Sequence, residues 1–166
     1  MPKPSELKAL ETVYKGYRFR SRLEARWAFF FTEIGWKWKY EPEGFNLEDG
    51  DYYLPDFYLP DICKGTWFEV KAERPNEREE RVAQKLACAS GEFVAVAFGD
   101  PYEALTTPCT KLFYSNSLSR SWECLDERAY FFFSMSLVDF FPHMNGCYME
   151  SAEKARQYRF DPGGRF

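Results

Sequence analysis

The hydrophobic pattern of the first third of the chain has the period of an amphipathic helix. Ser21 and Glu24 have the S-x-x-E spacing of a capping box, which predicts a helix start at this point. Gly35 is expected to end the helix, because glycine readily adopts the left-handed conformation found after helix C-termini. The apolar stripe that follows the start has helical spacing and consists of Leu23, Trp27, Phe30 and Ile34.

Shorter apolar runs downstream alternate with the period of strands. They predict a strand over 36–41, a hairpin of 45–47 and 52–58 around the turn EDGD, and a third strand over 66–72. A second helix is expected from Asn76, capped with Glu79, to about Gly91, followed by a buried strand over 92–98. Its inward residues should be Val82, Ala83, Leu86 and Ala87. The predicted order is therefore helix, three strands, helix, strand, which indicates an α/β fold with a mixed sheet flanked by helices.

The two ends of the chain are less strongly patterned. Residues 1–13 look like a polar lead-in, and the last third predicts a short helix over 101–107, a strand over 111–114, a strand within 129–137 and a helix over 150–158. Neither an internal repeat nor a long linker is present. We therefore expect a single domain over 1–166, with a core over 14–100 and a C-terminal extension, 101–166, packed on it.

Composition narrows the class of protein. The chain has 166 residues, 45% of them hydrophobic and 20% aromatic, which excludes a disordered protein. A net charge of −4 argues against a protein that coats nucleic acid by bulk attraction. It does not exclude a protein that binds nucleic acid through a local basic patch. Five cysteines without a CxxC pair predict reduced thiols and a cytoplasmic location. No signal-like core opens the chain, and the apolar run 129–141 is too short to span a bilayer, so we expect no membrane partner.

The stretch YLPDFYLPDICKGTWFEVKAE, residues 53–73, carries the candidate chemistry. Asp56 and Glu69 fall on strands predicted to be adjacent, so their carboxylates can converge, and one of them would have to be protonated unless a cation lies between them. Mg²⁺ or Mn²⁺ suits these oxygen ligands, with the Val70 carbonyl as a further ligand. Lys71 lies on the same side of its strand as Glu69 and could orient a water, and Glu24 could complete the cluster. The set predicts metal-assisted phosphodiester hydrolysis.

These motifs, Pro55-Asp56 and Glu69-Val70-Lys71 after a helix with the acid of SRLEARWAFFF, resemble the PD-(D/E)xK or restriction-endonuclease-like nuclease superfamily. The sequence around these motifs also resembles small nuclease-like proteins of bacteriophages and mobile elements, which implies a host cytoplasmic location. The resemblance implies a Mg²⁺-dependent endo- or exodeoxyribonuclease, with nicking or structure-selective cutting. It implies that Asp56, Glu69 and Glu24 belong to the metal site and that Lys71 is the water-positioning base. Gln84 is a candidate accessory residue.

Binding DNA requires local positive charge, and two segments supply it. The first basic segment includes Lys15, Arg18, Arg20, Arg22, Arg26, Lys37 and Lys39. The second has near-helical spacing and consists of Arg74, Arg78, Arg81 and Lys85. Both could contact phosphates, and Tyr14 and Tyr17 could stack on unpaired bases. Acidic neighbours such as Glu77 leave the alternative of an ordinary solvated helix face.

Other functions remain open at this stage. Zinc is not expected, because its candidate ligands have long spacings and lone cysteines are more often buried: Cys109, Cys124, His143 and Cys147. A nuclease-like protein that binds DNA without cutting it is one alternative, and an interaction protein that inhibits a host factor is another. The sequence leaves open DNA against RNA, strandedness, cutting at ends or inside, and a homodimer.

Overall fold

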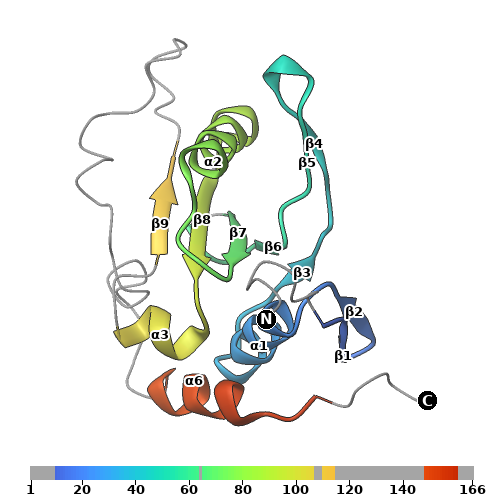
Figure 1. Ribbon diagram of the computed structural model, residues 1–166, viewed down its shortest axis with the longest axis vertical. Coiled ribbons are helices and arrows are strands. Elements are labelled where there is room, and N and C mark those ends of the chain that lie inside the picture. The colour runs from blue at the N-terminus through green and yellow to red at the C-terminus, as the bar shows by residue number, and fades with distance from the viewer. Residues whose placement is uncertain (1–9, 64, 107–109, 115–147, 161–166) are drawn as a thin grey trace, which may run out of the picture.

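A five-stranded mixed sheet forms the centre of the protein (Figure 1). The computed structural model describes residues 10–63, 65–106, 110–114 and 148–160. The strands lie in the order β3 (Lys39–Tyr40), β6 (Phe57–Leu59), β7 (Thr66–Lys71), β8 (Phe93–Phe98) and β9 (Thr110–Phe113). Only β7 and β8 pair in parallel, and the other neighbours are antiparallel. The protein is therefore α/β with a mixed sheet, as the sequence predicted.

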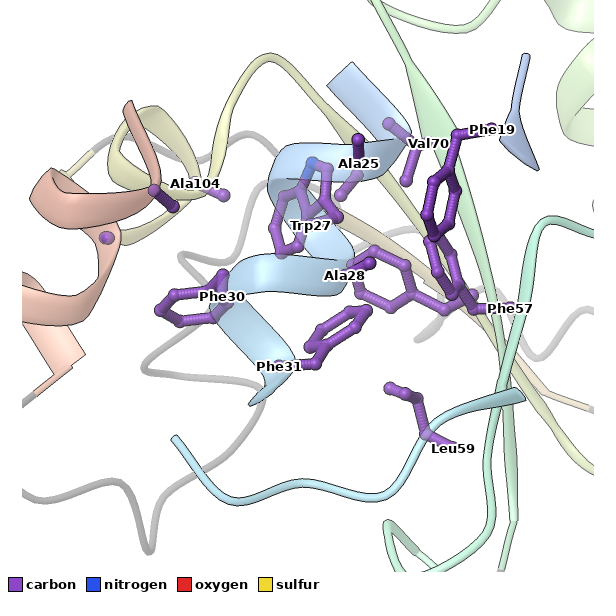
Figure 2. Packing of buried hydrophobic residues seen from close by; sticks show 14 of the residues in the cluster. Phe19, Ala25, Trp27, Ala28, Phe30, Phe31, Phe57, Leu59, Val70 and Ala104 are labelled. Carbon is purple, nitrogen blue, oxygen red and sulfur yellow. The ribbon is translucent and has the colours of Figure 1, made fainter. Parts of the chain in front are cut away.

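Helix α1 (Arg22–Glu33) covers one face of this sheet. The predicted start is confirmed, because the hydroxyl of Ser21 accepts the backbone N–H of Glu24 at 3.1 Å. In Figure 2 the ring of Phe31 lies between α1 and the strands, near Phe57, and the two ring centroids are 5.5 Å apart. Three aromatic side chains of α1, Trp27, Phe30 and Phe31, are fully buried in this part of the core, and burying one such ring contributes about 1.5–3 kcal/mol.

Helix α2 (Glu77–Ser90) covers the opposite face. Its start is also as predicted, since Asn76 and Glu79 form both bonds of a capping box, and Gly91 ends it with a left-handed φ of 69°. Its buried side packs on the second hydrophobic cluster, which consists of Leu47, Trp67, Ala83, Leu86, Ala87, Val94, Val96 and Phe113. Alternate residues of β7 consequently face different helices, with Trp67 towards α2 and Phe68 towards α1.

Two short hairpins lie outside the central sheet. The first, β1 (Thr12–Tyr14) with β2 (Tyr17–Phe19), was not predicted. Its turn, Lys15-Gly16, has positive φ at both residues, 48° and 80°, as two-residue hairpin turns require. The second, β4 (Phe45–Asn46) with β5 (Tyr52–Tyr53), contains a 3₁₀ turn, η2 (Glu48–Gly50), and confirms the predicted hairpin around EDGD.

Two predicted strands were too long. The run 52–58 is not one strand, because it breaks after Tyr53 and resumes at Phe57 in a different sheet. Pro55 within the break has no N–H to give to a ladder, and the Asp56 carbonyl instead accepts the N–H of Glu41 at 2.8 Å. The run 36–41 is a strand only at Lys39–Tyr40, where it pairs with β6. The break places Asp56 just before β6.

The C-terminal helix α6 (Tyr148–Gln157) packs against α1 and the short helix α3 (Pro101–Thr106). Arg156 on α6 binds Asp100 with two bonds, 2.7 and 2.9 Å, and its guanidinium lies 4.3 Å from the centroid of Tyr102. The predicted elements over 101–107, 111–114 and 150–158 are thus confirmed with small shifts of their ends.

Some predictions fall outside the described residues: the strand within 129–137 and the candidate zinc ligands Cys109, Cys124, His143 and Cys147. Within the described part of the chain, no helix has the length and hydrophobicity needed to cross a membrane.

Candidate functional site

Two almost fully buried carboxylates, Asp56 and Glu69, meet at the carboxyl end of β7. Asp56 precedes β6 and is 2% exposed, and Glu69 lies on β7 and is 5% exposed. The Asp56 N–H donates to Glu69 Oε2 at 3.3 Å, and Asp56 Oδ2 accepts the N–H of Val70 at 2.8 Å. The structure therefore brings these predicted site residues together, because β6 and β7 are neighbours in the sheet.

The backbone N–H and C=O of Val70 point to the side of β7 on which Asp56 lies. The N–H and C=O of one strand residue point to the same neighbouring strand. Since the Val70 N–H points to Asp56, the Val70 carbonyl also points away from β8, beyond the end of the β6 pairing. The carbonyl of Lys71 points the opposite way and accepts the N–H of Gly99, just after β8, at 3.0 Å. The carbonyl of Val70, a predicted metal ligand, thus lies on the same side of β7 as Asp56.

Lys71 extends from the next position on the same side of the strand as Glu69. Its Nζ lies 2.7 Å from Glu69 Oε1 and 3.6 Å from Glu79 Oε1, on the first turn of α2. Burial alone would lower the pKa of Lys71, but the carboxylates of Glu69 and Glu79 raise the pKa above its ordinary value. Lys71 is therefore a protonated hydrogen-bond donor at neutral pH rather than a proton acceptor.

Glu24 is also buried, and its carboxylate is held by three donors at the start of α1. Its Oε1 accepts the hydroxyl of Ser21 at 2.7 Å, and its Oε2 accepts the hydroxyl of Tyr40 at 2.6 Å and the N–H of Arg20 at 3.2 Å. Burial, and next its bond to Glu24, raise the pKa of Tyr40, so this hydroxyl remains a donor. Glu24 thus contributes its charge to the site from within the capping network of α1.

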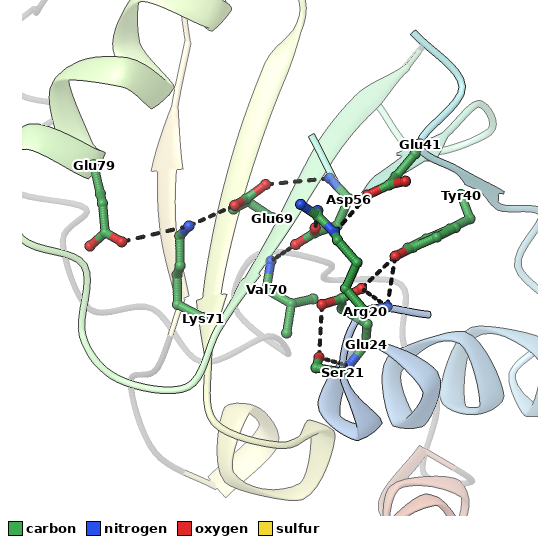
Figure 3. Close-up of polar contacts among 10 residues, drawn as sticks. All are labelled: Arg20, Ser21, Glu24, Tyr40, Glu41, Asp56, Glu69, Val70, Lys71 and Glu79. Atoms are coloured by element: carbon green, nitrogen blue, oxygen red, sulfur yellow. Dashed lines mark hydrogen bonds and ion pairs between the residues drawn. The ribbon is translucent and has the colours of Figure 1, made fainter. Parts of the chain in front are cut away.

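Arg20 reaches into the acidic cluster, a position that sequence reasoning missed (Figure 3). Its Nη2 lies 2.6 Å from Asp56 Oδ1, and its Nε lies 2.7 Å from Glu41 Oε1. The sequence had assigned Arg20 only to the DNA-contacting patch. A signal for its role was available, because Arg20 directly precedes Ser21, which caps the helix that carries the predicted acid Glu24. Glu41 carried no such signal.

Negative charge dominates this site. Figure 3 draws two cations, Arg20 and Lys71, among five carboxylates, those of Glu24, Glu41, Asp56, Glu69 and Glu79. Burial raises the pKa of Asp56 well above its ordinary value, and the charges of Glu69 and Glu24 raise it further. The Val70 N–H and Arg20 offset this effect only in part. A further cation would relieve the remaining repulsion among the carboxylates.

The hydroxyl of Tyr53, on β5, lies beside Glu69, a position that sequence reasoning also missed. Burial, and next the nearby Glu69 carboxylate to which it hydrogen-bonds, raise the pKa of the Tyr53 hydroxyl. The short hairpin β4–β5 thereby contributes a neutral donor to the site.

The donor set suits a small, hard cation in part. Among the described residues, no group of three or more His, Cys, Asp or Glu is arranged to hold a metal ion. Mg²⁺, however, commonly takes one or two protein carboxylates together with waters and substrate phosphate. The two carboxylates of Asp56 and Glu69, with the Val70 carbonyl, can supply such oxygen donors. Each carboxylate carries lone pairs beyond those used by its present partners. The pair of acids, rather than a ring of three, fits such an ion.

The predicted nucleic-acid contacts differ in exposure. Exposed side chains are Lys15, Arg18, Arg20, Arg22, Arg74, Arg78 and Arg81. Half-buried ones are Arg26, Gln84 and Lys85. Tyr17 is exposed at the β1–β2 hairpin, whereas the ring of Tyr14 packs against Phe29, Tyr158 and Phe160. Tyr17 is consequently the better placed of the two tyrosines to stack on a base.

No protein-family model matches the chain, and the searches of curated proteins and of solved structures likewise find no match. The function of the protein is therefore inferred from the geometry of the site.

Proposed function

We propose that the protein is a metal-dependent DNA nuclease with a restriction-endonuclease-like core of the PD-(D/E)xK type. The observation that carries this proposal is the convergence of Asp56 and Glu69, both almost fully buried, with the Lys71 ammonium 2.7 Å from Glu69. Two buried carboxylates this close cost several kcal/mol unless cations compensate them, and Arg20 and Lys71 supply only one cationic partner for each acid. A site of this kind is more consistent with ion binding than with stabilisation of the fold.

Each residue has a distinct role in this proposal. Asp56, Glu69 and the Val70 carbonyl would hold Mg²⁺ or Mn²⁺, and the bound ion would supply positive charge to the phosphate that is cut. Lys71, protonated and fixed by Glu69, donates a hydrogen bond that can orient the attacking water or stabilise charge on the phosphate. Glu24 fixes Tyr40 and the backbone of Arg20 through its hydrogen bonds, and so keeps the wall of the site in place.

A DNA substrate is supported by the exposed basic residues on both sides of the acids. Lys15 and Arg18 belong to the β1–β2 hairpin, and Arg22 is in the first turn of α1. Arg78 and Arg81 lie three residues apart on α2, whose first turn reaches Lys71 through Glu79. Phosphate contacts from both segments would orient the strand across the site despite the net charge of −4.

One observation favours a second candidate function, a nuclease-like protein that binds DNA without cutting it. Asp56 is already paired with Arg20, and Glu69 is already paired with Lys71, so each acid has a cation partner from the chain itself. In that case the cluster would be a closed ion-pair network with no affinity for divalent metal.

The deciding experiment incubates the protein with circular and linear, single- and double-stranded DNA in Mg²⁺, Mn²⁺ or EDTA. We expect cutting in Mn²⁺ or Mg²⁺ that EDTA and the Asp56→Asn substitution both abolish. Asp61→Asn is a matched control, because it makes the same chemical change in an exposed ion pair with Lys37. DNA binding without cutting of any substrate would reject the nuclease and support the second candidate.

A further inference from the structure

Arg20 pairs with one of the two carboxylate oxygens of Asp56, a residue proposed to hold the metal ion. The other oxygen, Oδ2, points to the N–H of Val70, whereas Oδ1 receives the guanidinium at 2.6 Å. An ion at Oδ1 and a guanidinium in direct contact with the same atom would repel each other strongly at this range. The metal and Arg20 therefore compete for one carboxylate oxygen.

Of the two partners, Arg20 is the one that can move. Asp56 is 2% exposed and fixed through its backbone N–H and its carbonyl to Glu69 and Glu41. The side chain of Arg20 is 57% exposed, so its guanidinium can turn into solvent once its ion pairs with Asp56 and Glu41 are broken. Its backbone N–H stays bound to Glu24 and Tyr40, which gives the side chain a fixed pivot at the edge of the site (Figure 3).

We propose that Arg20 is the resident counter-ion of Asp56, that a divalent metal displaces it, and that the released guanidinium then binds a phosphate of the nucleic acid. The inference rests on the proposed metal site and names the residue that links metal binding to substrate binding. A guanidinium released beside the site is well suited to phosphate, since its planar donors match two phosphate oxygens.

A purely structural Arg20 would behave in the opposite way. If the guanidinium only joins the end of β2 to the sheet, its removal loosens Asp56 and weakens metal binding. If it is a counter-ion, its removal leaves the acids with less competition and tightens metal binding. The sign of the change in metal affinity distinguishes the two roles.

The first measurement is calorimetric titration of Mn²⁺ into four forms of the full chain without DNA. We expect Arg20→Gln to tighten binding about 10-fold, the scale on which a neighbouring charge shifts such equilibria. Arg20→Lys, which keeps the charge, should stay within about 3-fold of wild type. Arg18→Gln should equal wild type, because Arg18 is exposed and pairs with Glu11 away from the site. Thermal unfolding of each variant checks that it is folded.

The second measurement tests the phosphate contact in a Lys71→Ala background, in which the proposed nuclease should cut the DNA at least about 100-fold more slowly. Anisotropy of a labelled oligonucleotide is followed with and without Mn²⁺. We expect Arg20→Gln to weaken binding about 5-fold or more in Mn²⁺ and much less in EDTA, where the guanidinium remains on Asp56. Equal weakening in both conditions would overturn the proposed release.

These outcomes separate this inference from the proposed function. Mn²⁺ binding that depends on Asp56 but is unchanged or weaker in Arg20→Gln overturns the counter-ion role and leaves the metal site standing. If no form binds Mn²⁺, the metal site and the counter-ion role are both rejected.

Discussion

The backbone N–H of Asp56 donates to the Glu69 carboxylate at 3.3 Å, although the side chains of the two residues carry like charges and are both almost fully buried. The distance between the two acids depends on the sheet, because β6 and β7, the strands next to which or on which they lie, are paired with each other. Asp56 directly precedes Phe57, which pairs with Phe68 next to Glu69, so the paired strands keep the two acids close to each other. Three predictions concern this pair and the network around it, and a fourth concerns the packing of α6.

Asp56→Asn should stabilise the protein in EDTA and destabilise it relative to wild type in Mn²⁺. The environment raises the pKa of Asp56, so it favours the neutral form. The gain from removing the buried charge is opposed by the amide NH₂, which must face Arg20 or the Val70 N–H, and we expect a net gain of about 1 kcal/mol in the free energy of unfolding. In Mn²⁺ the wild type gains the free energy of metal binding, about 2.7 kcal/mol at 100 times the Kd. Thermal unfolding in both buffers measures the reversal, with Asp61→Asn expected to follow the wild type. A variant less stable than wild type in EDTA would contradict this interpretation of the site.

Lys71→Ala should separate cutting from binding. One phosphate contact among several carries about 1 kcal/mol, so DNA affinity should stay within a few-fold. Loss of a donor to the transition state should lower the cutting rate by roughly 10² or more. Single-turnover cleavage and anisotropy give the two numbers, and Lys154→Ala, in an exposed pair with Glu150 on α6, is the control. Cutting at the wild-type rate by Lys71→Ala would remove this residue from the site.

Glu24→Gln tests a residue for which two roles were open, a cap and a metal-site acid. The three donors around its carboxylate predict a structural cost, because an amide presents one acceptor oxygen and places its NH₂ against donors. We expect a fall of about 1–2 kcal/mol in the free energy of unfolding, measured in urea. Tyr40→Phe should cost less, because it leaves the Ser21 bond intact.

Glu33→Gln, exposed at the end of the same helix, should be neutral and is the matched control for Glu24→Gln. Mn²⁺ affinity in Glu24→Gln decides whether the acid also serves the metal. A marked loss of that affinity with unchanged stability would favour the metal-site role and contradict the capping role.

Arg156→Gln should weaken the packing of α6 in a pH-dependent way. Burial alone would raise the pKa of Asp100, but the bonds from Arg156 and from the N–H groups of Glu103 and Tyr102 lower it below 3.8. A lowered carboxyl pKa stabilises the fold above the unfolded-state value, and this contribution is lost as the pH falls through the folded-state value. The variant should therefore lose about 1–2 kcal/mol at pH 7, and its difference from wild type should shrink below about pH 4.

Denaturant unfolding across this pH range measures the effect on α6, with Lys154→Gln on the same helix as the exposed control. A difference that stays constant down to pH 2 would mean that the pair does not act through charge.

Features that depend on neighbours in the sequence were predictable. The starts of α1 and α2 follow from Ser21 and Asn76, because a cap contacts residues only two or three positions away. The convergence of Asp56 and Glu69 needed only the adjacency of two strands. The restriction-endonuclease-like assignment and the nuclease function remain predictions.

Features that depend on distant partners were not. The strand ends at Tyr53 and Phe57 are set by pairing with two different sheets, and hydrophobic alternation does not encode the partner. The β1–β2 hairpin was missed because residues 14–20 read equally well as an aromatic and basic surface patch. Arg20 was assigned by charge alone, since its contact with Asp56 spans 36 positions.

Gly99 connects the strand that carries Lys71 to the buried side chain of Trp27. Its N–H donates to the carbonyl of Lys71, its own carbonyl accepts the indole N–H of Trp27 at 3.1 Å, and its φ is 85°. A side chain at this position is strained, and any shift there is passed to the strand that carries Lys71. In a random mutagenesis screen for inactive protein, Gly99 should therefore recur beside the acids, although it has no chemistry of its own.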